Sequence, residues 1–499
     1  MANHLYDHLI APHAGNSATF LSRETHPDIS FARFAHMVAQ TAHRLCAAGL
    51  TPGDRIVVQA PKTVEMVALY GAAVQAGGVF LPLNTGYTRD EVAYFVGDAT
   101  PSIIVCDGKD AAQMTEIAQG ATVLTLNADG TGSLTEGLDD LPTRFDTVDR
   151  GPDDLAALLY TSGTTGRSKG AMLSHDNLLS NTQSLTDLWQ ITEADVLAHA
   201  LPIFHTHGLF VALNTCMLAG ARVHFMPGFD LDAMMAALPR ATMLMGVPTF
   251  YTRLLSDPRL TSDLVQNVRL FVSGSAPLLA ETHAAFTART GHAILERYGM
   301  TETNMNTSNP YEGDRRPGTV GHPLPGVEVR LTDAQTGTPV PAGEVGMVEV
   351  RGPNVFQGYW QMPEKTAAEL RDNGFFITGD LGQFDDDGYL AIVGREKDLI
   401  ITGGYNVYPK EIEDVLNDIE GVSESAVVGV PDADFGEAIV AVVVAEPGAD
   451  LGEDSLAATV KDKLARFKHP RRYVFAPELP RNTMGKVQKN ALRDTYSAA

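Results

Sequence analysis

The chain alternates short apolar runs with longer segments whose apolar residues recur at helical spacing. Residues 54–60, 77–84 and 102–107 are rich in Val, Ile, Leu and Phe, which is typical of buried strands. Residues 31–50 and 63–78 repeat apolar side chains every three or four positions, which indicates helices. This alternation predicts an α/β fold with largely parallel sheets, and ligands on such sheets usually bind beyond the carboxyl ends of the strands.

The same rhythm continues through residues 221–299, and the pattern changes after about residue 310. Residues 346–360 and 374–394 have the spacing of strands joined by tight turns. From residue 395 onward, a helix–strand pattern indicates a separate small α/β unit. We therefore predict an N-terminal domain over residues 1–394 and a C-terminal domain over residues 395–499.

Charge and composition limit the partners. The 499 residues carry a formal net charge of −24, which argues against nucleic acid or an anionic membrane as the main partner. A local basic pocket for a small anionic ligand is still compatible with that balance.

The first residues lack the features of a secretory signal, and no apolar stretch is long enough to span a bilayer. Cys46, Cys106 and Cys216 are widely spaced, so we expect three buried free thiols in a reducing cytoplasm.

Residues 161–170, TSGTTGRSKG, follow an expected short strand at residues 155–160. Glycines let backbone N–H groups approach phosphate oxygens, hydroxyl side chains donate further hydrogen bonds, and Arg167 and Lys169 supply positive charge. The order Ser168-Lys169-Gly170 does not match a Walker A loop, so an ordinary P-loop kinase or ATPase is excluded. Composition alone leaves two interpretations open: a polyphosphate-binding loop or a flexible glycine-rich surface loop.

Five motifs occur in the order typical of one large family. They are YTSGTTGRSKGAMLSH, RYGMTE, TGD, GREKDLIITGGYNVYPKEIE and PRNTMGK. Through them the chain resembles, from about residue 30 to about residue 490, the ANL adenylate-forming superfamily of acyl-CoA synthetases, peptide-synthetase adenylation domains and luciferases. The resemblance implies a large N-terminal domain of two α/β sheets plus a β-barrel, and a small C-terminal α/β domain that acts as a lid.

The resemblance also implies an AMP-forming acid–thiol ligase that works in two steps. A carboxylate attacks the α-phosphorus of ATP to give an acyl-adenylate and pyrophosphate, and a thiol, usually that of coenzyme A, then displaces AMP. ATP and coenzyme A are therefore the expected co-substrates, and Mg²⁺ is the expected cofactor. Small molecules are the expected partners, without a role for nucleic acid or membrane.

Individual roles follow from the matching motifs. Glu302 would hold Mg²⁺, because a carboxylate beside a triphosphate requires a divalent cation between them, and Thr301 would contact the α-phosphate. Tyr298 would stack on adenine, with ordinary packing as the alternative, and Asp380 would accept from the ribose hydroxyls with help from Arg395. The ATP-binding candidates are Thr161, Ser162, Gly163, Thr164, Thr165, Gly166, Lys169, Gly274, Ser275, Ala276, Tyr298, Gly299, Asp380 and Arg395.

Lys486, in the PRNTMGK motif, is the main catalytic candidate, and Thr301, Glu302 and His207 complete that set. A positioned ammonium stabilises the negative charge that gathers on the α-phosphate and on the bridging carboxylate oxygen in the first step. The lid would then rotate about Lys397, and Gly403 and Gly404 would line the pantetheine tunnel. Because Lys486 lies on a predicted exposed loop, a lysine acetyltransferase and a deacetylase are candidate protein partners.

Arg297 precedes the Tyr-Gly pair, where relatives acting on aliphatic or aromatic acids commonly carry a small or neutral residue. A guanidinium in an apolar acyl pocket requires an anionic partner, and we expect neighbouring Glu296 to point to the other face of the strand. A second carboxylate on the substrate would satisfy Arg297, with Ser275 and His207 donating further hydrogen bonds. His205 and His207 are expected on one side of a strand or extended segment and are too few for a metal site.

The Arg297 pattern resembles that of the malonyl-CoA synthetases, which predicts malonate as the acid and methylmalonate as a tolerated variant. One alternative is a synthetase for another short carboxylic acid, or a stand-alone adenylation enzyme that loads a carrier protein. A degenerate nucleotide-binding module used as a sensor or scaffold is the other alternative, against which the retained Lys486, Glu302 and loop 161–170 argue.

Overall fold

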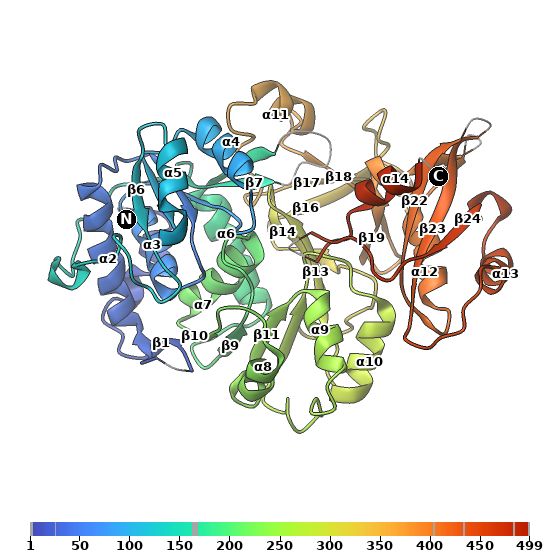
Figure 1. Ribbon diagram of the computed structural model, residues 1–499, viewed down its shortest axis with the longest axis horizontal. Helices are drawn as coiled ribbons and strands as arrows, with labels where there is room; N and C mark the ends of the chain where they lie inside the picture. Colours follow the sequence, from blue (N-terminus) through green and yellow to red (C-terminus); the bar gives the residue numbers. More distant parts are fainter. Residues whose placement is uncertain are drawn as a thin grey trace.

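The N-terminal part of the computed structural model contains two large sheets (Figure 1). The structure describes residues 3–24, 26–161, 168–402, 405–432, 435–482 and 485–497. The larger sheet has nine strands, in the order β15 (His322–Pro323), β14 (Asn304–Ser308), β13 (Leu295–Met300), β12 (Leu270–Ser273), β11 (Met243–Gly246), β9 (Val196–His199), β10 (Arg222–Phe225), β1 (Thr19–Ser22) and β2 (Ile29–Ser30). Its central strands pair in parallel, and antiparallel pairing is confined to β13–β14–β15 and β1–β2 at the two edges.

The second sheet has six strands, in the order β6 (Thr122–Thr125), β5 (Ile103–Cys106), β3 (Arg55–Gln59), β4 (Val79–Pro82), β7 (Leu155–Thr161) and β8 (Lys169–Ser174). All of its pairings are parallel except that between β7 and β8. The expected α/β architecture with largely parallel sheets is confirmed. The predicted strands at residues 54–60, 77–84, 102–107 and 155–160 correspond to β3, β4, β5 and β7.

The two sheets share one apolar core with the helices packed between and around them. Every residue of α3 (Val64–Gln75) except Glu65 is buried, because this helix lies inside that core. Side-chain caps fix where the long helices begin: Thr63 Oγ1 accepts from Met66 N, and Ser30 Oγ accepts from Arg33 N at the start of α2 (Phe31–Ala47). The other helices here are α1 (Tyr6–Leu9), α4 (Arg89–Ala99), α5 (Ala111–Ile117), α6 (His175–Leu188), α7 (Asn214–Ala219), α8 (Leu231–Ala237), α9 (Pro248–Leu255), α10 (Ala280–Thr290) and α11 (Pro363–Glu369).

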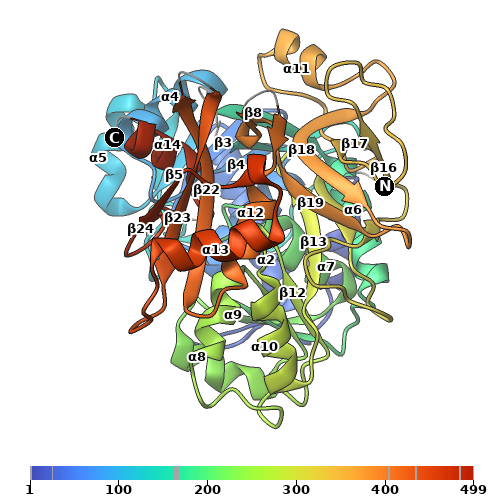
Figure 2. The same ribbon diagram turned by 90° about the vertical axis from the view of Figure 1, so that its right-hand side faces the viewer.

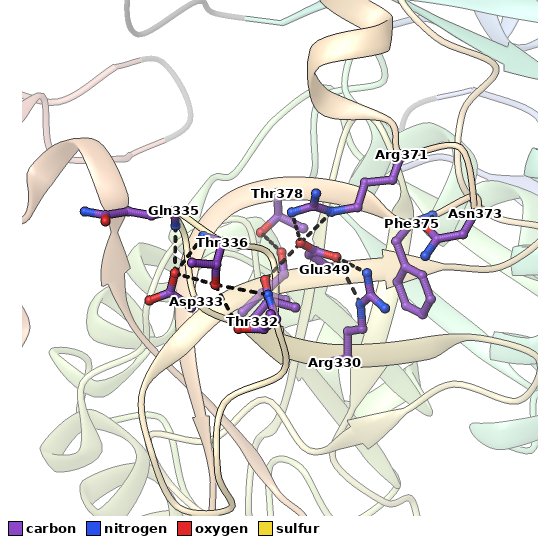
Figure 3. A network of polar contacts seen from close by, with 12 residues as sticks. Arg330, Thr332, Asp333, Gln335, Thr336, Glu349, Arg371, Asn373, Phe375 and Thr378 are labelled. Carbon is purple, nitrogen blue, oxygen red and sulfur yellow. Dashed lines mark hydrogen bonds and ion pairs between the residues drawn. The ribbon is translucent and has the colours of Figure 1, made fainter.

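A third sheet is antiparallel and follows the two large sheets along the chain. Its strands are β16 (Glu328–Thr332), β17 (Gly346–Arg351), β18 (Phe376–Phe384) and β19 (Leu390–Arg395), in that order. Glu349 on β17 is fully buried and accepts hydrogen bonds from Arg330, Arg371 and Thr332 (Figure 3). Arg371 lies two residues after the end of α11, so this carboxylate ties the end of α11 to the sheet.

The C-terminal part forms a small α/β unit beside the rest of the chain (Figures 1 and 2). Its sheet contains β21 (Tyr405–Val407), β20 (Ile400–Thr402), β23 (Gly436–Ala445) and β22 (Val422–Asp432), with β24 (Arg472–Phe475) paired to β23. The helices are α12 (Pro409–Asn417), α13 (Glu453–Lys463) and α14 (Lys489–Ser497). Two separate apolar clusters on the faces of this sheet indicate that the unit has its own core.

The cysteine prediction is wrong for one residue. Cys106 and Cys216 are buried free thiols, as expected, but Cys46 is exposed, because it lies near the end of α2 on the side that faces solvent. Across the described ranges, no helix is both long and apolar enough to cross a membrane.

Candidate active site

The predicted nucleotide-binding residues gather where strands of both sheets end. Thr161 closes β7 and Lys169 opens β8, on either side of the glycine-rich loop. The predicted phosphate-binding residues Ser162, Gly163, Thr164, Thr165 and Gly166 lie outside the described residues. Gly274, Ser275 and Ala276 follow β12, Arg297, Tyr298 and Gly299 lie on β13, and Thr301 and Glu302 form the turn between β13 and β14.

Three residues expected at the nucleoside lie in contact with one another. The Tyr298 hydroxyl donates to Asp380 Oδ2 at 2.6 Å, and Arg395 Nε lies 2.9 Å from Asp380 Oδ1. Burial and the Asp380 carboxylate raise the pKa of Tyr298 well above its usual range, so the phenol stays protonated. Gly299 is required at its position, since a Cβ there would lie 1.9 Å from the Asn304 backbone oxygen. The Tyr298 ring is thus held by its hydroxyl beside the acidic group expected at the ribose.

Lys486 reaches the same place from the C-terminal domain. Two hydrogen bonds close its loop: Lys486 N donates to Asn482 Oδ1 at 3.0 Å, and Asn482 N donates to Lys486 O at 2.9 Å. Burial lowers the pKa of Lys486 to about 8, Arg395 acts in the same direction, and Asp380 opposes both. The Lys486 side chain therefore lies within range of the charges of the Asp380–Arg395 pair.

Glu302 and Lys169 belong to a charged group that also contains Tyr359 and Glu369. The Tyr359 hydroxyl lies 3.0 Å from Glu302 Oε1 and 2.6 Å from Glu369 Oε2. Lys169 Nζ lies 3.3 Å from Glu369 Oε2 and 4.1 Å from the centre of the Tyr359 ring. Sequence reasoning missed Tyr359 and Glu369, and no spacing signal pointed to them, because Lys169 and Glu369 are 200 positions apart.

The same group fits the predicted magnesium site. One phenol proton satisfies only one carboxylate at a time, and Glu302 makes no ion pair within the described part of the chain. Glu302 is only 6% exposed, and burial raises its pKa. A divalent cation at Glu302 would offset the cost of that buried charge, and Mg²⁺ prefers carboxylate and phosphate oxygens. Glu302 is therefore suited to the role expected of it.

Arg297 is a buried cation with unused hydrogen-bond donors. Its side chain lies on β13, the residue is 5% exposed, and its Nε and Nη2 atoms have no hydrogen-bond partner among the residues that the structure describes. Glu296 is not the anionic partner of Arg297, because its Oε1 accepts a hydrogen bond from Gly318 N at 3.2 Å. Burial lowers the pKa of Arg297 to about 9. Unpaired donors on a buried cation are costly, so these two atoms point to an anionic ligand.

The guanidinium is bordered by the other predicted acid-binding residues. A Cβ on residue 274 would lie 2.2 Å from Arg297 Cζ, so only glycine leaves room for this side chain. His207 Nδ1 lies 3.2 Å from Ser275 Oγ, and His207 Nε2 is a further buried atom for which the described residues offer no partner. Burial and the Arg297 charge lower the pKa of His205 to about 4 and that of His207 well below its usual range. Both imidazoles are therefore neutral at pH 7, and Arg297 supplies the charge.

The prediction that His205 and His207 lie on a strand or extended segment is wrong. His207 begins a seven-residue π-helix, η4 (His207–Leu213), and His205 lies in the turn before it. Every residue of η4 is buried, so the periodicity that separates a strand from a helix is absent from this segment. Short π-helical stretches often occur at functional sites. No cluster of three or more potential metal ligands occurs in the described residues.

The interface between the two domains contains a cavity of about 530 Å³. The N-terminal domain lines it with Lys62, Thr85, Thr249, Arg253 and mostly apolar residues, and the C-terminal domain adds Arg481, Asn482 and Gly485. No acidic residue lines this cavity, within the ranges that the structure describes. The predicted hinge residue Lys397 lies in the short helix η6 (Glu396–Asp398) between β19 and β20, whereas Gly403 and Gly404 lie outside the described residues.

Comparison with known proteins assigns both the N-terminal and the C-terminal part of the chain to a protein family. Residues 11–360 match the AMP-binding enzyme family, and residues 411–486 match the C-terminal domain of AMP-binding enzymes. A malonate–CoA ligase from Arabidopsis thaliana is 35% identical over 483 residues, which cover 89% of this chain and 78% of that protein. A feruloyl-CoA synthase from an Amycolatopsis species is 36% identical over 472 residues and 94% of each chain.

Solved structures show the same fold over the whole chain. The crystal structure of ATP-bound MatB from Rhodopseudomonas palustris is 56% identical, covers 100% of this chain and 99% of its own, and has a TM-score of 0.98. The apo crystal structure of the same protein has a TM-score of 0.88, so the arrangement described here is closer to the ATP-bound form. The chain belongs to the AMP-binding enzyme family, the acyl-CoA ligases of the ANL adenylate-forming superfamily.

Proposed function

We propose that the protein is an ATP-dependent malonate–CoA ligase that also accepts methylmalonate, forming malonyl-CoA, AMP and pyrophosphate. The observation that carries the proposal is Arg297, whose buried Nε and Nη2 atoms lack a partner within the described ranges. The distal carboxylate of a diacid accepts from both atoms, whereas a monocarboxylate leaves them unpaired at a cost of several kcal/mol. The malonate–CoA ligase from Arabidopsis supports the same acid.

In the first step an oxygen of the proximal carboxylate bonds to the α-phosphorus of ATP, and the bond from that phosphorus to pyrophosphate breaks. Lys486 donates to the oxygens on which negative charge gathers, and Thr301 contacts the same phosphate. A Mg²⁺ ion held by Glu302 would neutralise charge on the phosphates of ATP. His207, neutral and adjacent to Ser275, orients the acid beside Arg297. Because both ends of the acid are held, its proximal carboxylate oxygen meets the α-phosphorus in a fixed orientation.

In the second step the sulfur of coenzyme A attacks the acyl carbon, the bond to AMP breaks, and the thiol proton passes to solvent. The thiol needs the space that the Lys486 loop occupies in this structure, so the lid of residues 395–499 turns about Lys397 relative to residues 1–394. Gly403 and Gly404 then line the channel for pantetheine, where the absence of side chains leaves room for a narrow substituent.

Reversible acetylation of Lys486 is part of the same proposal. An acetyl group removes the charge on which the first step depends, so an acetyltransferase would switch the enzyme off and a deacetylase would restore it. The support is the position of Lys486 on a partly exposed loop.

A pyrophosphate-release assay with acetate, malonate, methylmalonate, succinate and coumarate tests the proposal. We expect kcat/KM for malonate to exceed that for acetate and for coumarate by about a hundredfold or more, because a charged contact separates them. Equal use of acetate or coumarate rejects the diacid assignment. Parallel reactions with free coenzyme A test the acceptor: pyrophosphate release without malonyl-CoA formation shows that the acceptor is a carrier protein instead.

A further inference from the structure

Lys62 lines the interface cavity, and the roles proposed above do not use it. It follows β3 of the six-stranded sheet, yet its Nζ donates to His199 Nδ1 at 2.9 Å and to His199 O at 3.1 Å, at the end of β9 in the nine-stranded sheet. Nζ also lies 4.6 Å from the centre of the Phe225 ring, on which the His199 ring stacks with an interplanar angle of 4°. No carboxylate pairs with Lys62 among the described residues, so the amine is not held by an ordinary ion pair.

These contacts fix which nitrogen of His199 carries the proton. Nδ1 accepts from Lys62, so the ring proton is on Nε2, which donates to Gly208 O at 2.8 Å. His199 is completely buried, and burial together with Lys62 holds its pKa well below the usual range, so the ring is neutral and has a single N–H. Gly208 O can only accept, so it keeps the ring proton on Nε2 and leaves Nδ1 as the acceptor that Lys62 occupies.

Gly208 is the second residue of η4, and its backbone packs closely against that of Pro202. A Cβ on residue 208 would lie 2.0 Å from the Pro202 backbone oxygen. His207, which precedes it, is held on its other side by the contact between Nδ1 and Ser275 Oγ. The Lys62–His199–Gly208 relay thus fixes the start of η4 and, through it, the direction in which the unpaired His207 Nε2 points.

We propose that Lys62 is a positioning residue for recognition of the diacid, acting through His199 and Gly208 on His207. The proposal rests on the function assigned above and adds a residue to it. A buried network in which every member is hydrogen-bonded is rigid, and a displacement of about 1 Å in a substrate-orienting group reduces rates by up to about a hundredfold. Without the amine, His199 Nδ1 becomes a buried acceptor without a donor, which favours displacement of the ring and, with it, of the bond to Gly208 O.

The test compares Lys62→Met with Lys62→Arg, and with Lys109→Met as a matched control at an exposed lysine (74% side-chain exposure). We expect Lys62→Met to lower kcat/KM for malonate by about tenfold to a hundredfold while KM for ATP changes less than about twofold. The ratio of kcat/KM for malonate to kcat/KM for acetate should fall in the same variant. Lys62→Arg, which still donates, should restore most of the malonate activity, and Lys109→Met should behave as wild type.

Two results would overturn the proposal: unchanged malonate kinetics in Lys62→Met, or equal losses for malonate, acetate and ATP. If Lys62→Met unfolds at a clearly lower temperature than wild type, Lys62→Gln replaces it. The Gln amide is too short to reach His199, so the same loss of kcat/KM for malonate is expected. Wild-type enzyme in the same assay separates this proposal from the assigned function. If wild type does not prefer malonate, the function is wrong; if it does and the Lys62 variants match it, only the Lys62 inference is wrong.

Discussion

The proposed preference for a diacid rests on one side chain, Arg297, whose surroundings do not fit a purely structural arginine. Arg297 is buried, its Nε and Nη2 atoms lack partners in the described chain, and the adjacent Glu296 bonds to Gly318 instead. A guanidinium that served only the fold would be paired by the protein itself. The unpaired, buried guanidinium therefore lowers the stability of the free protein, and a bound anion would offset that cost.

Arg297→Met tests this at similar side-chain volume. We expect kcat/KM for malonate to fall by about a hundredfold or more, because a charged contact with two donors typically contributes about 2–5 kcal/mol. Activity with acetate should stay the same or rise, since the buried charge that a monocarboxylate leaves unpaired is gone. The measurement is pyrophosphate release with both acids, with Arg351→Met, an exposed arginine outside the site, as the control. Parallel losses for the two acids would contradict a role in selecting the diacid.

Lys486 allows a prediction about pH. With its pKa lowered to about 8, the amine is charged at pH 7 and becomes neutral as the pH rises through about 8. The charged form stabilises the phosphates, so kcat/KM for ATP should decline above about pH 8. The neutral form is the nucleophile, so acetylation of Lys486 by an amine-reactive reagent should rise with a midpoint near pH 8 in nucleotide-free enzyme. Peptide mass spectrometry measures both Lys486 and exposed Lys109, which reports the reagent's own pH dependence; a Lys486 curve identical to that of Lys109 would contradict the burial argument.

At the scale of elements, α11 is attached to the small sheet through Glu349 (Figure 3). Arg330 donates to Glu349 Oε2 at 3.0 and 2.7 Å, and Arg371 donates to Oε1 at 2.8 and 2.6 Å. Arg371 follows the helix whose last residue, Glu369, pairs with Lys169 of the phosphate loop. The position of Glu369 therefore depends on the buried Glu349 carboxylate of β17.

Glu349→Gln should lower stability measurably, because it removes the charge that two arginines share. Both arginines keep some solvent contact, so we expect a loss of about 2 kcal/mol rather than the larger penalty of a fully buried pair, seen as a lower unfolding midpoint. Glu328→Gln, which affects an exposed pair with Arg351 in the same sheet, should change stability by less than about 0.5 kcal/mol. Equal midpoints for the two variants would show that burial of Glu349 adds nothing.

The elements and the motif positions were predictable because their signals are local. The apolar runs gave β3, β4 and β5 within two residues at each end, and Arg297, Tyr298, Asp380 and Lys486 stand in short motifs. The contacts around them were not predictable. Lys169 meets Glu369 across 200 positions and Lys62 meets His199 across 137, and packing in three dimensions is what joins each pair. The η4 segment was mistaken for an extended segment because a wholly buried run carries no periodicity to read.

At the scale of the whole molecule, the C-terminal domain brings the Lys486 loop against the N-terminal domain, as the proposed first step requires. Lys486 enters from the C-terminal domain, and a Cβ on Gly485 would lie 3.6 Å from Thr249 of the N-terminal domain. Arg493 of α14 donates to Asp398 at 2.6 Å, which ties the lid helix to the hinge segment. The interface cavity beside this loop keeps space between the domains, so the closed arrangement is compatible with a later rotation.

Lys486→Ala separates the two steps that this lid serves. Adenylation, followed as malonate-dependent pyrophosphate release from ATP, should fall by at least about 10²-fold, because a positioned ammonium stabilises charge that develops only in that step. Thioester formation from preformed malonyl-adenylate and coenzyme A should be nearly unchanged, since the rotation removes Lys486 from the site before the thiol arrives. Lys489→Ala, on the same domain but paired with Glu413 of α12, is the control for general damage to the lid. Equal losses in both half-reactions of Lys486→Ala would show that the lysine serves the lid as a whole and not the adenylation step.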